Sequence, residues 1–328
     1  MLNRRRFIQV LASGASAPAL PALSQSTGRV YRVGWLAGSS EMLKEPQALA
    51  FEQRLRELGF VEGRNLAIER RHISGRLEEL PAAAAELAKL NCDALFCSGA
   101  EAYLTALTKA SRNTPIVVVA VDFDPVATGY VASLARPGGR VTGITAIQSE
   151  LPAKRLEILG ELLPRMTRVA ALNNEQTAAQ LEVVQSAAKR LGLTVHVADL
   201  KRPPFDYAAA FAGIVRAKAE ALIVLGSGLW VPARPQIIRH ALDARLPTMF
   251  HQAQWVESGG LMSYGFNFPS MWRRGAEMLV NILRGAAPAT TPMEQPTTFE
   301  MVINAKLVKA LGIKVPPTIL ARADRVVE

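Results

Sequence analysis

The strongest constraint on the fold is a pattern of short strands and longer helices that runs through the first half of the chain and then starts again. Short segments rich in β-branched residues alternate with amphipathic segments of about 10–15 residues, which is typical of parallel βαβ units. A helix predicted at 156–163 ends before Pro164, and a new first strand follows at 168–172. We therefore expect an α/β protein with two doubly wound, Rossmann-like lobes and a hinged cleft between them.

The two halves contain comparable sets of predicted elements. In the first half, strands are expected at 30–36, 66–73, 93–97, 116–121 and 141–146, and helices at 46–58, 77–90 and 101–111. In the second half, strands are expected at 168–172, 194–200, 221–225 and 248–250, and helices at 178–191, 205–218 and 232–244. The last elements are a strand-like run at 259–265, a helix at 271–283, a strand at 298–303 and a helix at 305–311.

These elements divide the chain into two expected lobes. Lobe 1 is predicted over residues 29–146 and lobe 2 over residues 147–265. The chain is expected to cross between them around 143–151 and again around 259–265. Part of 266–328 is expected to join lobe 1, and the remainder to pack on lobe 2.

The first 26 residues have the composition of an export signal. Three arginines at positions 4–6 precede an apolar stretch at 10–23, and small residues follow at a plausible cleavage point. The arginines followed by Phe7-Ile8 resemble a twin-arginine signal, and a general secretory signal stays open as the alternative. No cysteine follows the apolar stretch, so a lipid anchor is not expected. The location expected for the mature chain is the periplasm, without insertion in the membrane.

The net charge is +10 over the whole sequence and +7 without the first 26 residues, where 35 basic residues stand against 28 acidic ones. The basic residues are scattered singly and in pairs, and aromatic residues are not interleaved with them. A nucleic-acid partner is therefore not expected.

The sequence lacks the usual signatures of enzymes and metal sites. It contains no Gly-x-Gly-x-x-Gly after a strand, no phosphate loop, no nucleophile elbow and no His-Glu-x-x-His. Cys92 and Cys97 would point to opposite faces of one strand, so neither a disulfide nor a metal site is expected between them. The predicted protein has no catalytic residue, no metal ion and no cofactor.

Small and polar residues follow the predicted strands, at the sheet edge where open α/β proteins bind ligands. Backbone N–H groups at helix starts suit a ligand carboxylate, and an Asp suits a ligand ammonium. Trp230 and Phe123 are the expected stacking partners for an apolar ligand group. The same residue types also cap helices and form turns, so that alternative stays open at each position. The candidate ligand-binding residues are Ser39, Ser40, Ser98, Gly99, Asp122, Phe123, Asp124, Asn173, Asn174, Gly226, Ser227, Trp230 and Gln252.

Four runs carry a family resemblance. They read VASLARPGGRVTG at 131–143, GGLMSYG at 259–265, EQPTTFEMVIN at 294–304 and LGIKVPPTILARAD at 311–324. Through these runs the chain resembles the substrate-binding proteins of ABC transporters, in the subgroup that includes the tryptophan/phenylalanine-type binding proteins. The resemblance implies a type I periplasmic-binding fold, a small-molecule ligand (often an aromatic amino acid) and an inner-membrane ABC permease as partner.

The sequence departs from the family at 97–101 and 173–174, where ligand specificity is expected to lie. We therefore expect a non-enzymatic periplasmic receptor for an amino acid or an aromatic or carboxylate compound, which delivers its ligand to an ABC permease. A periplasmic sensor of the same fold that signals to a membrane receptor is the alternative. The third hypothesis is an exported enzyme, in which Asp122, Asp124 and Ser98 would be the catalytic residues. The ligand, its affinity, the partner permease and the oligomeric state stay open.

Overall fold

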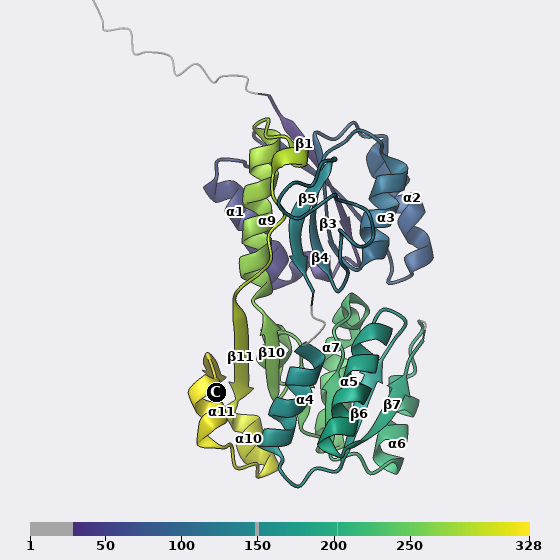
Figure 1. Ribbon diagram of the computed structural model, residues 1–328, viewed down its shortest axis with the longest axis vertical. Coiled ribbons are helices and arrows are strands. Elements are labelled where there is room, and N and C mark those ends of the chain that lie inside the picture. Colours follow the sequence, from purple (N-terminus) through teal and green to yellow (C-terminus); the bar gives the residue numbers. More distant parts are fainter. Residues whose placement is uncertain (1–28, 148–150, 202) are drawn as a thin grey trace, which may run out of the picture.

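The computed structural model describes residues 29–147, 151–201 and 203–328, and these residues form two α/β lobes (Figure 1). This architecture confirms the predicted fold class. The predicted export signal lies outside the described residues. Within the described residues, no helix has the length and apolar character needed to cross a membrane.

Lobe 1 is built on a five-stranded parallel sheet with the order β2-β1-β3-β4-β5. Helices α1 and α9 cover one face of this sheet, and α2 and α3 cover the other (Figure 1). The strands are β1 (Tyr31–Ala37), β2 (Leu66–His72), β3 (Ala94–Gly99), β4 (Ile116–Val121) and β5 (Val141–Ala146). The helices are α1 (Pro46–Glu57), α2 (Leu80–Ala88), α3 (Glu101–Ala110) and α9 (Phe268–Leu283), with short 3-10 helices η1 (Met42–Lys44) and η2 (Leu77–Glu79).

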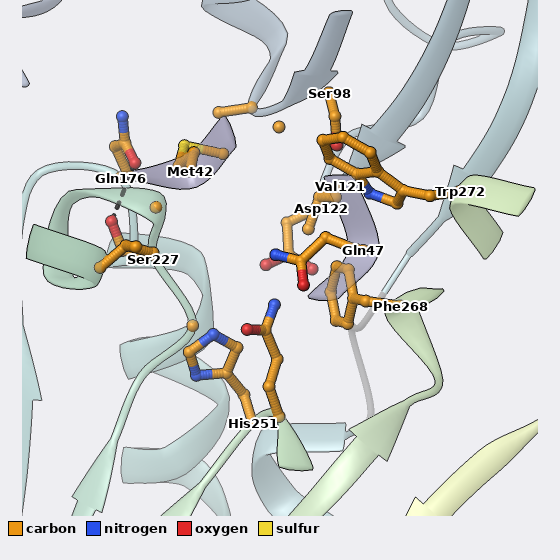
Figure 2. A pocket seen from close by; sticks show the side chains of 16 residues that line it. Met42, Gln47, Ser98, Val121, Asp122, Gln176, Ser227, His251, Phe268 and Trp272 are labelled. Atoms are coloured by element: carbon orange, nitrogen blue, oxygen red, sulfur yellow. Dashed lines mark hydrogen bonds between the residues drawn. The ribbon is translucent and has the colours of Figure 1, made fainter. Parts of the chain in front are cut away.

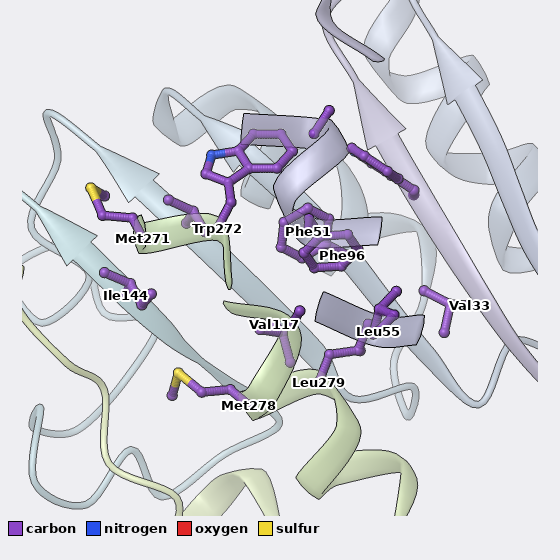
Figure 3. Close-up of a cluster of buried hydrophobic side chains, with 14 of the residues drawn as sticks. Val33, Phe51, Leu55, Phe96, Val117, Ile144, Met271, Trp272, Met278 and Leu279 are labelled. Carbon is purple, nitrogen blue, oxygen red and sulfur yellow. The ribbon is translucent and has the colours of Figure 1, made fainter. Parts of the chain in front are cut away.

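Alternation along the strands divides the core of lobe 1 into two layers. In β1, Trp35 packs in the layer under α1 and α9, and the next residue, Leu36, packs under α2 and α3. An aromatic cluster fills the first layer (Figure 3), in which Phe51 stacks on Phe96 with ring centroids 4.2 Å apart. Trp272 of α9 meets the ring of Phe96 edge-on at 5.4 Å, so α9 is fixed to the sheet by aromatic contacts.

Lobe 2 is built on a seven-stranded sheet with the order β12-β11-β10-β9-β8-β6-β7, in which only the pairing of β10 with β11 is antiparallel among the described pairs. Its strands are β6 (Arg168–Asn173), β7 (Thr194–Asp199), β8 (Ala221–Val224), β9 (Thr248–Phe250), β10 (Met262–Phe266), β11 (Phe299–Asn304) and β12 (Arg325–Val327). Its helices are α4 (Leu151–Leu162), α5 (Ala178–Leu191), α6 (Tyr207–Arg216), α7 (Arg234–Asp243), α8 (Ala253–Glu257), α10 (Ala305–Leu311) and α11 (Pro317–Arg322), with the 3-10 helix η3 (Gly228–Ala233).

Helix α9 ties the two lobes together, because it packs on lobe 1 although β10 before it and β11 after it belong to lobe 2 (Figure 1). Asn267 caps its start by accepting a hydrogen bond from the Ser270 backbone N–H at 2.9 Å. The segment after α9, which includes the 3-10 helix η4 (Pro288–Thr290), runs along lobe 1 before it returns to lobe 2. On lobe 1, the Glu294 N–H of this segment donates to the carbonyl of Gly143 in β5 at 2.9 Å.

The sequence predicted the regular elements well and the ends of the chain less well. Helix α5, strands β4, β5 and β9, and helix α10 have the predicted bounds. Helix α4 begins at Leu151 and not at 156, because Pro152 occupies the first turn, where its missing N–H costs nothing. The run at 259–265 is mostly β10 of lobe 2, and the chain crosses to lobe 1 directly after it, between Phe266 and Phe268. The short elements α8, α11 and β12 were not predicted.

Gly143 provides a test of how closely strands β4 and β5 approach each other. Its φ is +145°, and a Cβ atom would lie 1.9 Å from the Val118 carbonyl oxygen of the neighbouring strand. We expect Gly143→Ala to lower the free energy of unfolding by about 3 kcal/mol or more, because backbone on the partner strand has to move. Gly139→Ala is the matched control, since its Cβ would meet nothing within 4 Å. Equal thermal stability of the two variants would contradict this description of β5.

Candidate functional site

A cavity of about 110 Å³ lies between the lobes, where the carboxyl ends of strands from both sheets face each other (Figure 2). Both lobes and the connecting helix α9 contribute to its wall. Lobe 1 and α9 supply Met42, Gln47, Ser98, Gly99, Ala100, Val121, Asp122, Phe268 and Trp272. Lobe 2 supplies Gln176, Gly226, Ser227, Gly228, Val231, His251 and Gln252.

The lobe 1 wall places a carboxylate beside a helix N-terminus. Ser98 and Gly99 end β3, and α3 starts two residues later with no side chain capping its first turn. Asp122 follows β4, the neighbouring strand, and holds a left-handed backbone conformation with φ +60°. Because backbone N–H groups at a helix start attract anions, this wall offers an anion-binding and a cation-binding group on adjacent strands.

A glutamine of α5 connects the lobes across the cavity. The Gln180 side chain makes two hydrogen bonds to the Gly226 backbone, donating to its carbonyl and accepting from its N–H, both at 2.9 Å. The same Nε2 donates to Asp122 Oδ2 of lobe 1 at 2.6 Å. The carboxylate of Asp122 is therefore oriented by lobe 2 when the lobes are close together.

A buried ion pair also joins the lobes. Arg234, at the start of α7, donates from two nitrogens to the two oxygens of Glu45, at the start of α1, with both distances 2.7 Å. Only 16% of the Arg234 side chain and 7% of the Glu45 side chain are exposed. Bidentate geometry makes this contact stronger than a surface pair. Both interlobe contacts require the closed arrangement of the lobes.

His251 lies after β9 and is almost completely buried, with 4% of its surface exposed. Burial, with the positive charges of Arg155 and Arg234, lowers the pKa of His251 to about 3. The imidazole is therefore neutral at physiological pH. Among the described residues that line the cavity, Asp122 is therefore the side chain that carries a charge.

The structure brings six of the predicted site residues together around the cavity. These six are Ser98, Gly99, Asp122, Gly226, Ser227 and Gln252. Ser98 and Gly99 end β3, and the other four follow β4, β8 or β9 within three residues. The carboxyl ends of β3 and β4 point towards lobe 2 (Figure 1). Their position in the cavity wall was therefore predictable from the rule that ligand sites form at the carboxyl ends of parallel strands.

The two predicted stacking residues lie elsewhere. Trp230 is completely buried in the core of lobe 2, where its indole N–H donates to the Leu225 carbonyl at 3.0 Å. Phe123 packs in lobe 1 with its ring edge-on to Tyr130. Neither ring lines the cavity, because each is packed in the hydrophobic core of its own lobe.

The other predicted residues that do not line the cavity shape local turns instead. Ser39 accepts from the Met42 N–H, Asp124 accepts from the Val126 N–H, and Asn174 accepts from the Gln176 N–H. Ser40 donates to the Glu41 carboxylate, and Asn173 donates to Asp199. At these positions the capping and turn alternative describes the structure.

Sequence reasoning missed much of the cavity wall. Met42, Gln47, Gln176, Phe268 and Trp272 line it and were not candidates. For Phe268 and Trp272 a signal existed: Asn267 followed by Pro269 marks a helix start earlier than the predicted 271. With that start, the two aromatic residues stand four positions apart at the cleft end of α9. Nothing in the sequence distinguishes the glutamines from surface residues.

Three comparisons with known proteins place this geometry in a family. A model of the family described as ABC transporter substrate binding protein matches residues 46–327. The chain belongs to this family. It is also 23% identical over 284 residues to a tyrosine-binding protein of Clostridioides difficile strain R20291, covering 84% of this chain and 81% of the relative.

Solved structures agree with the fold of this substrate-binding protein. A conserved domain protein from Vibrio cholerae superposes with a TM-score of 0.81 and 24% identity, covering 91% of this chain and all of that one. An ABC domain from Streptococcus pneumonia in complex with L-Trp superposes with a TM-score of 0.79 and 23% identity over the same shares. The predicted family and the two-lobed fold are therefore confirmed.

The ion pair between the lobes makes a prediction about closure. Arg234→Gln leaves the Glu45 carboxylate buried without its cation, which costs the closed arrangement about 3 kcal/mol or more. Opening the lobes rehydrates Glu45, so we expect a larger radius of gyration in small-angle X-ray scattering, and not unfolding. Arg273→Gln is the control, because Arg273 pairs with Glu57 within lobe 1 at 2.7 Å. The same radius of gyration for wild type and Arg234→Gln would contradict the role of this pair.

Proposed function

We propose that this protein is a periplasmic receptor that binds an amino acid between its lobes and delivers it to an ABC permease. The observation that carries the proposal is that the Asp122 carboxylate and the start of α3, which no side chain caps, lie in the same wall of the cavity. The family and the closed arrangement of the lobes support the role of receptor.

Asp122 is the group proposed to bind the ligand ammonium. Its carboxylate lies in the cavity wall, and Gln180 fixes one oxygen by a hydrogen bond. A hydrogen bond between an ammonium and an ionised carboxylate is shorter and stronger than one between neutral groups. This contact would therefore contribute much of the affinity.

The start of α3 is proposed to bind the ligand carboxylate, through the backbone N–H groups of the first turn and the Ser98 hydroxyl. Adjacent strands lie about 4.8 Å apart. The ends of β3 and β4 are therefore close enough to hold the two charged groups of one α-carbon. Met42, Phe268 and Trp272 form the apolar part of the wall.

Binding between the lobes explains why ligand and closure are coupled. A ligand that contacts both walls binds the closed arrangement more tightly than the open one, and only this difference shifts the equilibrium. The Glu45–Arg234 and Asp122–Gln180 contacts also form only in the closed arrangement, so they lower the free energy that the ligand has to supply for closure. A permease that recognises the closed surface would then select loaded receptors.

The relatives support an amino acid as the ligand class. One is named for tyrosine binding, and another was solved with L-Trp. Delivery to a permease rests on the family. The periplasmic location rests on the composition of the first 26 residues.

Thermal unfolding with the twenty amino acids tests the proposal. The protein would be unfolded, dialysed and refolded to remove bound ligand. We expect a saturable rise in melting temperature for one chemical class, because a ligand selective for the folded state stabilises by about 2.7 kcal/mol at a hundredfold excess over its Kd. Calorimetry should give one site per chain. A flat response to all twenty would refute the proposal.

A pair of neighbouring carboxylates gives a sharper test. We expect Asp122→Asn to weaken binding of the amino acid found in that screen at least tenfold, because the ammonium loses its counter-charge. Asp124→Asn is the matched control, since Asp124 lies outside the cavity wall and its remaining side-chain oxygen can still accept from the Val126 N–H. Equal affinities of the two variants for the ligand would contradict the proposal that Asp122 binds the ammonium.

A further inference from the structure

Several residues of the cavity wall hold buried polar atoms that lack a hydrogen-bond partner among the described residues. From lobe 1 and α9 these atoms are Gln47 Oε1 and Trp272 Nε1. From lobe 2 they are Gln176 Nε2 and His251 Nδ1. Atoms of this kind also occur away from the cavity, such as Trp255 Nε1 and Ser263 Oγ, but these four lie on the wall of one cavity. Buried polar groups in folded proteins are nearly always satisfied, so the four need partners within the cavity.

The lobe 1 pair is deeply buried and held in place. Gln47 is 4% exposed and Trp272 is 2% exposed. The indole of Trp272 is packed against Trp35 and Phe96, with ring centroids 5.6 and 5.4 Å away, so it cannot turn its N–H to solvent. The Gln47 amide lies in the middle of the cavity view, between the labelled Asp122 and Phe268 (Figure 2). These atoms require partners from whatever fills the cavity.

The unsatisfied atoms include both donors and acceptors. The Trp272 N–H and the Gln176 amide nitrogen donate, and Gln47 Oε1 accepts. If Asp122 and the start of α3 bind the ammonium and the carboxylate, the side chain of the ligand has to satisfy these atoms. An aliphatic side chain or a phenyl ring would leave all of them unpaired.

Few charged side chains lie near the cavity among the described residues. The carboxylate of Glu45 is paired with Arg234, and the completely buried Arg155 lies close enough to Asp122 to interact electrostatically. Among the described residues of the wall, no further charged side chain is present for a charged ligand side chain. A Lys, Arg, Asp or Glu side chain would bring an uncompensated charge into a buried site.

We propose that the ligand is an amino acid whose uncharged side chain both donates and accepts hydrogen bonds, such as an amide or a hydroxyl, and that Gln47, Gln176 and Trp272 recognise it. This inference rests on the proposed function and names the ligand class of the same site. His251, neutral and buried, adds a further polar group to the lobe 2 wall.

Two pairs of amino acids of matched shape test the ligand class by calorimetry: glutamine against methionine, and tyrosine against phenylalanine. We expect the polar member to bind at least tenfold more tightly in each pair that binds, because a site built for hydrogen bonds rejects the analogue that lacks them. Equal or tighter binding of methionine or phenylalanine would overturn the inference and leave the proposed function standing. Binding of no amino acid in the wider screen would refute the proposed function itself.

Gln47→Met tests the residue assignment, since it keeps the shape and removes the unsatisfied oxygen. We expect the preference for the polar member to fall at least tenfold, while the ligand-free variant melts no lower than wild type because no hydrogen bond is lost. Gln185→Met, on the exposed face of α5, is the control and should change neither quantity. An unchanged preference in Gln47→Met, or a lower melting temperature without ligand, would overturn the assignment of Gln47.

Discussion

The structure depends on the packing of one helix against a lobe to which its neighbours in sequence do not belong. Helix α9 buries Trp272, Met278 and Leu279 on the sheet of lobe 1, whereas β10 and β11 on either side pair with each other in lobe 2. The chain must therefore cross the cleft on both sides of α9. These crossings connect the lobes, and they bring the start of α9 to the cavity.

This arrangement gives the two walls of the cavity different physical characters. The lobe 1 wall combines a carboxylate, a helix start and the rigid aromatic cluster around Trp272. The lobe 2 wall consists mainly of neutral polar side chains and glycines from the segments after β6, β8 and β9, with Val231 as its apolar residue. Two contacts join the lobes, Glu45 with Arg234 and Asp122 with Gln180, and of these residues Asp122 also lines the cavity, so it takes part both in closure and in the proposed binding of the ligand.

The sequence predicted the fold because periodicity and turn residues act locally. The βα alternation identified both lobes, and the strand ends identified Ser98, Asp122 and Ser227 in the cavity wall. Sequence reasoning failed where the outcome depends on contacts between distant segments. Trp230 belongs to the same connection after β8 as Gly226 and Ser227, but it packs against the rings of Phe205 and Tyr207 in the core of lobe 2. Trp272 lies in the helix predicted at 271–283 and was not a candidate, because only the packing of α9 on lobe 1 brings it to the cleft.

Native mass spectrometry of the ligand-free protein, incubated with an equimolar mixture of the twenty amino acids, tests the central claim most directly. The competition makes the protein select its own ligand. The account predicts one adduct per chain, with the mass of an amino acid that has an uncharged, hydrogen-bonding side chain. No adduct would contradict the receptor function, and an adduct with the mass of phenylalanine, methionine, arginine or aspartate would contradict the account of how the cavity recognises its ligand.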